Sequence, residues 1–169
     1  FVMFGFATAS VYRLARCFKF NLTVSFLLSS LFWLYPCHYG FKHPVSLLQM
    51  QLDSTYMCII LIAVSNTLIY ALEPEKTKNA LLAGILMGLA VWGRGNSLPY
   101  ILITACCPFF YIAWKLAVEK EGGRKWNLTF NFLLFNAIAI SMSAWFYFSQ
   151  WDQLKNYYSL HVGLAKNTP

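Results

Sequence analysis

The chain alternates between long apolar segments and short polar linkers. Six apolar segments can be marked: Phe1–Leu14, Leu22–Tyr35, Thr55–Leu72, Ala80–Trp92, Leu98–Leu116 and Leu128–Trp151. A helix needs about 20 residues to cross about 30 Å of hydrocarbon, and the second and fourth segments fall short of that length. Helix is expected throughout, because a membrane strand would alternate polar and apolar residues. We therefore predict an all-α fold, a polytopic bundle of transmembrane helices with about six spans.

The composition points to the same class. The residues are 59% hydrophobic and 11% charged, with a mean hydropathy of +0.52, whereas a soluble domain carries about 25% charged residues. The net charge of +7 comes from basic residues in short clusters between the apolar segments. This pattern fits a topology signal better than a face for nucleic acid. We expect the lipid bilayer to be a partner and nucleic acid not to be one.

The positions of the basic residues predict which linkers lie together. Three alternate linkers and their flanks carry Arg13, Arg16, Lys19, Lys76, Lys78, Lys115, Lys120, Arg124 and Lys125. If the chain weaves, these linkers share one side, and the positive-inside rule places that side in the cytoplasm. The other side receives Cys37–Ser54, Gly93–Ser97 and the tail after Trp151. Residues 1–151 then form the transmembrane domain, and residues 152–169 form a non-cytoplasmic tail or loop. The expected location is the endoplasmic reticulum or a bacterial inner membrane, as an integral multi-pass protein.

Two residues on the non-cytoplasmic side are candidates for chemistry. Asp53 directly precedes the third segment, where it either caps a helix or offers a carboxylate to a ligand. Arg94 lies between Gly93 and Gly95, which permit close approach of the backbone to a ligand. Asn96 adds a neutral donor, and a cation beside free amides suits a phosphate. The alternative is that the Arg94 side chain simply reaches the membrane surface.

Other positions carry weaker signals. His43 shares the loop of Asp53, together with His38, so a divalent metal is one interpretation of this loop. An interfacial or hydrogen-bonding role is favoured for these histidines, because their spacing matches no ligand signature. Gly84 and Gly88 lie one helical turn apart and predict a face for helix packing.

Taken in order, these features resemble those of a known enzyme family. The features that carry the resemblance are the exit Tyr12-Arg13-Leu14-Ala15-Arg16, Pro36 at a span end, Asp53 at a span head, the linker Glu73–Lys78, the helix Leu81–Ala90 and the cation Arg94. Between about Phe6 and Thr104 the chain is similar to GT-C type membrane glycosyltransferases that use dolichyl- or polyprenyl-phosphate sugars. The resemblance implies a non-cytoplasmic site that takes a lipid-phosphate-sugar donor from the bilayer. Asp53 would orient an acceptor or a metal, and Arg94 would contact the donor phosphate.

The resemblance also implies that part of the site lies outside this chain. Members of the family carry their catalytic acidic residue in the first non-cytoplasmic loop, which would precede Phe1. The chain opens inside an apolar segment with no initiator Met, so we expect it to be an internal piece of a longer protein. Two functions stay open. One is part of a membrane glycosyltransferase with no catalytic residue assigned here, and the other is a non-catalytic integral membrane subunit that packs with other membrane subunits.

Overall fold

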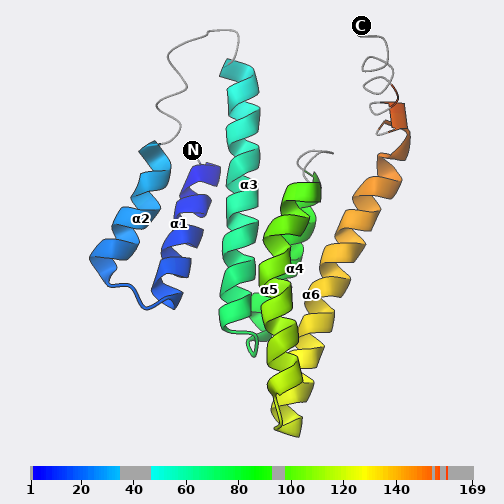
Figure 1. Ribbon diagram of the computed structural model, residues 1–169. Helices are drawn as coiled ribbons and strands as arrows, with labels where there is room; N and C mark the ends of the chain where they lie inside the picture. Colours follow the sequence, from blue (N-terminus) through cyan, green and yellow to red (C-terminus); the bar gives the residue numbers. More distant parts are fainter. Residues whose placement is uncertain (1, 35–46, 93–97, 154, 157–158, 160–169) are drawn as a thin grey trace, which may run out of the picture.

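The computed structural model describes residues 2–34, 47–92, 98–153, 155–156 and 159, and these are almost entirely helical. The helices are α1 (Val2–Cys17), α2 (Leu22–Leu34), α3 (Leu47–Leu72), α4 (Thr77–Trp92), α5 (Leu98–Val118) and α6 (Gly122–Ser149) (Figure 1). No strand occurs in the described residues. The prediction of an all-α fold is confirmed for this part of the chain.

Two helices begin well before the apolar segments that predict them. Helix α3 begins at Leu47 rather than Thr55, and α6 begins at Gly122 rather than Leu128. Hydropathy marks where a segment is apolar, but a helix continues through polar residues as long as its backbone hydrogen bonds form. The residues added to α3 include leucine, glutamine and methionine, which have high helix propensity.

Helix length limits how many of these elements can cross a bilayer unaided. Among the described residues, two helices are long and apolar enough to do so: α3, over Thr55–Leu72, and α6, over Gly122–Ser149. Helices α1, α2 and α4 have 16, 13 and 16 residues, which is about 20–24 Å at the usual rise. The helix lengths therefore do not support about six spans, although the described residues form six mainly apolar helices.

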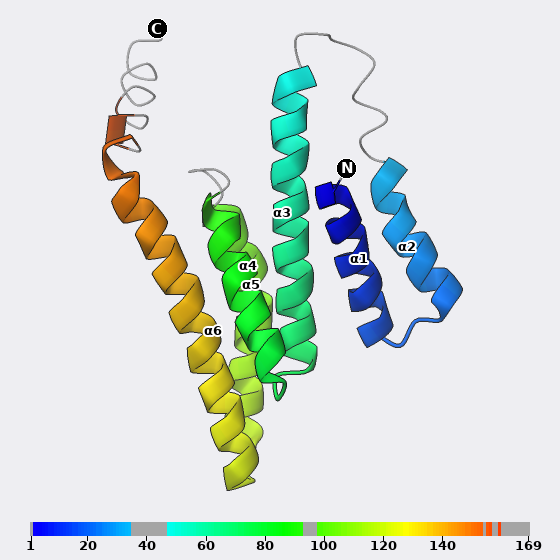
Figure 2. The same ribbon diagram turned by 180° about the vertical axis from the view of Figure 1, so that it is seen from behind.

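The helices lie roughly along one direction, with α3 in the middle (Figures 1 and 2). Helix α3 packs against α1, α4 and α5, while α2 packs on α1 and α6 packs on α4. The connections α1–α2, α3–α4 and α5–α6 all lie at one end of the bundle. This end carries Arg13, Arg16, Lys19, Lys76, Lys78, Lys115, Lys120, Arg124 and Lys125, and we call it the basic end. The predicted sharing of one side by these three linkers is confirmed.

Apolar side chains form the core of the bundle and also cover much of its outer surface. Polar side chains are buried between the helices: Ser25, Ser29, Ser65, Asn66, Thr67, Asn79 and Asn131. Large apolar side chains point outward along α2 and α6, where Phe26, Ile140 and Phe148 are 64%, 65% and 83% exposed. Exposed apolar surface on this scale is unfavourable in water and favourable in lipid.

Helices α4 and α6 approach each other through glycine. A Cβ atom added to Gly84 would lie 2.9 Å from the carbonyl oxygen of Phe135, and one added to Gly88 would lie 2.6 Å from the Cβ atom of Met142. The Trp92 indole then donates a hydrogen bond of 2.9 Å to the carbonyl oxygen of Met142. The prediction that the two glycines form a packing face is confirmed, and α6 is the helix that occupies it.

Candidate functional site

The predicted site residues are placed only in part. His43, Arg94 and Asn96 lie outside the described residues. The backbone at Asp53 is helical and lies six residues after Leu47, where α3 begins. An N-cap residue lies just outside its helix, so capping of α3 by Asp53 is wrong. The capping interpretation assumed that α3 begins with the apolar residues, whereas its polar turns are helical too.

An apolar groove lies on the half of the bundle away from the basic end. It has a volume of about 370 Å³ and is lined by Met3 of α1, Ile59 and Ile62 of α3, and Leu86, Leu89 and Trp92 of α4. The three helices that line it are neighbours, since α1 and α4 both pack against α3. The lining has no charged residue, so the groove suits a hydrocarbon chain and not a sugar or a phosphate.

The groove is adjacent in sequence to two of the predicted site residues. Ile59, which lines the groove, follows Asp53 by six residues on the same helix, which is about 9 Å along the helix axis. Trp92 lines the groove as the last residue of α4, and Arg94 comes two residues later in the sequence. The groove and these two residues are thus neighbours in the sequence, while Arg94 itself lies outside the described residues.

A polar network that the sequence analysis did not identify joins three helices near the basic end. The Arg13 guanidinium of α1 donates to the amide oxygens of Asn66 in α3, at 3.4 Å, and of Asn79 in α4, at 2.9 Å. The Asn66 amide nitrogen lies 3.4 Å from the Ser10 hydroxyl. Asn66 and Asn79 are 5% and 3% exposed. Arg13 thus compensates for the burial of two amide oxygens, which is costly without a donor.

Glu73 extends this network into the α3–α4 linker. Its carboxylate accepts a hydrogen bond of 3.0 Å from the Asn79 amide and one of 2.8 Å from the Lys76 ammonium. The hydrogen bond from Lys76 lowers the pKa of Glu73 below its usual range, because it favours the charged carboxylate. Two cations and one carboxylate are therefore held together where α1, α3 and α4 meet.

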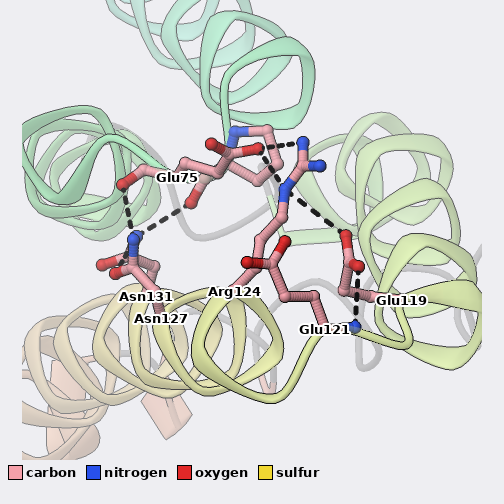
Figure 3. Close-up of polar contacts among 7 residues, drawn as sticks. Glu75, Glu119, Glu121, Arg124, Asn127 and Asn131 are labelled. Carbon is pink, nitrogen blue, oxygen red and sulfur yellow. Dashed lines mark hydrogen bonds and ion pairs between the residues drawn. The ribbon is translucent and has the colours of Figure 1, made fainter.

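A second cluster ties the same linker to α5 and α6 (Figure 3). The Arg124 guanidinium of α6 lies between two carboxylates, with Nε at 2.8 Å from Glu75 and 3.3 Å from Glu119. Asn127 donates a hydrogen bond of 3.2 Å to the backbone carbonyl of Glu75. The side chains of Arg124 and Glu75 are about half exposed, which limits the net stabilisation by this ion pair.

Asn131 is the most buried member of this cluster. It is fully buried and donates a hydrogen bond of 2.8 Å to the backbone carbonyl of Pro74. Helix α6 thereby satisfies a buried carbonyl that the proline-containing linker leaves free. A polar residue in the middle of an apolar helix is a recognisable signal, but the sequence does not identify its partner.

The described polar clusters hold helices together and do not by their geometry perform chemistry. No group of three or more His, Cys, Asp and Glu that could hold a metal ion occurs among the described residues. The histidines of the metal interpretation, His38 and His43, lie outside this part of the chain. The groove, with Asp53 and Arg94 near it in the sequence, is therefore the candidate functional site.

Comparison of the chain with known protein families, curated proteins and solved structures finds no match.

Proposed function

We propose that the chain is a membrane domain with several spans. The observation that supports this is the large exposed apolar surface of the bundle, together with asparagine, serine and threonine side chains buried beside its apolar core. Helices α3 and α6 are long enough to cross hydrocarbon on their own. The shorter helices α1, α2 and α4 reach the surface through locally thinned lipid or flanking residues. By the positive-inside rule, the basic end faces the cytoplasm.

Within this membrane domain, we propose part of a glycosyltransferase that takes a sugar from a polyprenyl-phosphate donor on the non-cytoplasmic side. The apolar groove carries this proposal, because it lies in the half of the bundle away from the basic end and is lined only by apolar side chains and Trp92. The groove would hold the first isoprene units of the donor. Arg94 would contact the donor phosphate, and Asp53 would orient the acceptor.

The transfer reaction needs a positive charge near the leaving group and a base near the acceptor. The leaving group is a phosphate, whose developing negative charge a nearby cation stabilises. The acceptor hydroxyl loses a proton when it attacks the sugar carbon, which requires a carboxylate base. This proposal assigns the role of that base to no residue of the chain. A divalent metal near Asp53 and His43 is an additional means of holding the phosphate.

The experiment uses the full-length protein in vesicles that contain a polyprenyl-phosphate-sugar donor. Leu89→Trp fills the groove, and we expect donor affinity to fall about tenfold, which is about 1.4 kcal/mol. Leu82→Trp is the matched control, because Leu82 is on the same helix, is similarly exposed and does not line the groove. Donor affinity that is equal in both variants would remove the groove from the site.

A second pair of variants tests the proposed contact of Arg94 with the donor phosphate. Arg94→Ala should lower sugar transfer much more than thermal stability, whereas Lys155→Ala, an exposed cation after α6, should leave transfer unchanged. Unchanged transfer in Arg94→Ala would exclude Arg94 from the site. If the full-length protein neither binds nor uses the donor, the transferase proposal fails.

One observation favours the alternative of a non-catalytic subunit. The apolar span of α6 is only 6% buried, because α6 packs on the bundle mainly through α4, and its outer face is available to other spans. Trp126, Leu133, Ile140 and Trp145 are each more than 60% exposed along it. If α6 joins a partner, affinity purification in mild detergent would recover a stable complex that Ile140→Arg disrupts. Sugar transfer by the isolated full-length protein would contradict a purely structural role.

A further inference from the structure

The structure divides the cations of the basic end into two classes. In the first class, each cation is bound to groups of the chain itself. Lys76 pairs with Glu73, Arg124 pairs with Glu75 and Glu119, and Arg13 is hydrogen-bonded to Asn66 and Asn79. Arg16 donates a hydrogen bond to the backbone carbonyl of Phe20, and the Lys115 ammonium lies over the ring of Tyr111. These contacts use three of the four glutamates of this end, so few carboxylates remain for the other cations.

The second class consists of exposed lysines, namely Lys19, Lys78, Lys120 and Lys125. None of these four has an ion pair with another residue in the described part of the chain. They lie at all three connections of the basic end: Lys19 between α1 and α2, Lys78 in the first turn of α4, Lys120 between α5 and α6, and Lys125 in the first turn of α6. The positive charge that the fold leaves unpaired is therefore spread over the whole end of the bundle.

Exposed aromatic side chains accompany these lysines. Phe18 and Phe20 flank Lys19, with their ring centroids 6.4 Å apart, and both are about half exposed. Trp126 follows Lys125 and is 74% exposed, and Trp114 lies in the last turns of α5. Aromatic side chains in such positions are typical of the headgroup level of a bilayer. A surface for an acidic soluble protein would not need apolar rings between its lysines.

We propose that Lys19, Lys78, Lys120 and Lys125 form a surface that binds anionic phospholipid headgroups in the leaflet at the basic end. The proposal rests on the membrane location and not on glycosyl transfer. Each cation near an anionic leaflet contributes attraction equivalent to about a fivefold change in binding. The internally paired Lys76 and Arg124 contribute little, because their charges are already compensated.

The test measures how strongly the full-length protein enriches a spin-labelled anionic phospholipid over a zwitterionic one in mixed vesicles. Changing the four lysines to glutamine should remove most of the enrichment, and changing the same four to arginine should retain it. Lys76→Gln, which breaks the ion pair with Glu73, should leave the enrichment within about twofold of the unchanged protein. The smaller variant Lys120→Gln/Lys125→Gln should lose part of the enrichment, and it keeps the test valid if the fourfold variant does not fold.

Several outcomes would overturn the proposal. Enrichment that survives the glutamine changes would show that these lysines do not select the lipid. A loss in the arginine variant equal to that in the glutamine variant would show that charge is not the cause. Displacement of the lipid by millimolar glycerol phosphate would indicate a site for a free phosphate instead of a membrane surface. None of these outcomes depends on donor binding or sugar transfer, so the two proposals fail independently.

Discussion

The backbone of Gly88 lies directly against the side chain of Met142, with only 2.6 Å between the Cβ position of Gly88 and the Cβ atom of Met142. The contact involves the Cβ atom of Met142, which is fixed to the α6 backbone and cannot rotate away. A methyl group at residue 88 therefore forces the two helices apart. Stacking of Trp92 on Phe146, at 6.0 Å between ring centroids, continues the same interface.

Gly88→Ala should lower the free energy of unfolding by about 1–3 kcal/mol, the usual cost of overpacking a close contact. Gly5→Ala is the control, because a Cβ atom at Gly5 would have nothing within 4 Å. Thermal unfolding of both purified variants in one detergent measures the difference. Equal midpoints for Gly88→Ala and Gly5→Ala would contradict the close approach of α4 and α6.

Asn131→Leu should also destabilise the protein, by about 1–3 kcal/mol, because it leaves the buried carbonyl of Pro74 without a donor. Asn136→Leu is a matched change five residues further along α6. The Asn136 amide donates only within its own helix, to the carbonyl of Phe132. Denaturation of both variants in the same detergent should give a lower free energy of unfolding for Asn131→Leu than for Asn136→Leu. If Asn136→Leu costs as much as Asn131→Leu, the link between α6 and the α3–α4 linker is not important for stability.

Arg13→Met should weaken the contacts of α1 with α3 and α4. The change keeps an unbranched apolar stem but removes the donor of two buried amide oxygens, so we expect a loss of about 1–3 kcal/mol. Arg16→Met should cost less, since Arg16 donates to the backbone carbonyl of Phe20 at an exposed turn. Limited proteolysis between α1 and α3 gives a local measurement. Equal proteolysis rates in the two variants would argue against the Arg13 network.

The stability contributed by Glu73 should depend on pH. Its pKa is lowered from about 4.5 by the hydrogen bond from Lys76, so the folded state binds this proton less readily than the unfolded state. The contribution is present above pH 4.5 and is lost as the pH falls through the pKa of the folded state. The difference in unfolding midpoint between the unchanged protein and Glu73→Gln should therefore shrink in acid. In a Lys76→Gln background the same comparison should show a weaker pH dependence.

The hydrophobic pattern predicted the existence, order and approximate ends of the helices. It also predicted that Gly84 and Gly88 pack against another helix, but the sequence did not identify α6 as that helix. The start of α3 was predicted too late, because polar residues such as Gln49 and Gln51 form helix as readily as apolar ones. The number of spans did not follow from the number of apolar segments, since α1, α2 and α4 are each shorter than a span.

The contacts of polar residues were the least predictable part. Arg13 was assigned to a topology signal, whereas it also joins α1 to Asn66 and Asn79, which are more than 50 residues away in sequence. A charge pattern along one chain does not reveal which charges are compensated in three dimensions. The apolar groove was likewise invisible, because Met3, Ile59 and Leu86 meet only when three helices pack together. The assignments of Asp53, His43, Arg94 and Asn96 to a ligand stay predictions.

Helix α1 is held in the bundle by contacts of different kinds along its length. Hydrogen bonds fix α1 to α3 and α4 near the basic end, whereas Met3 borders the groove ten residues away, about 15 Å along the helix. Between these two points Ala7 is fully buried against Cys58 and Ile62 of α3, with Phe4 packed beside it. Polar contacts near one end and close apolar packing near the other therefore fix the position of α1, and with it the position of Met3 at the edge of the groove.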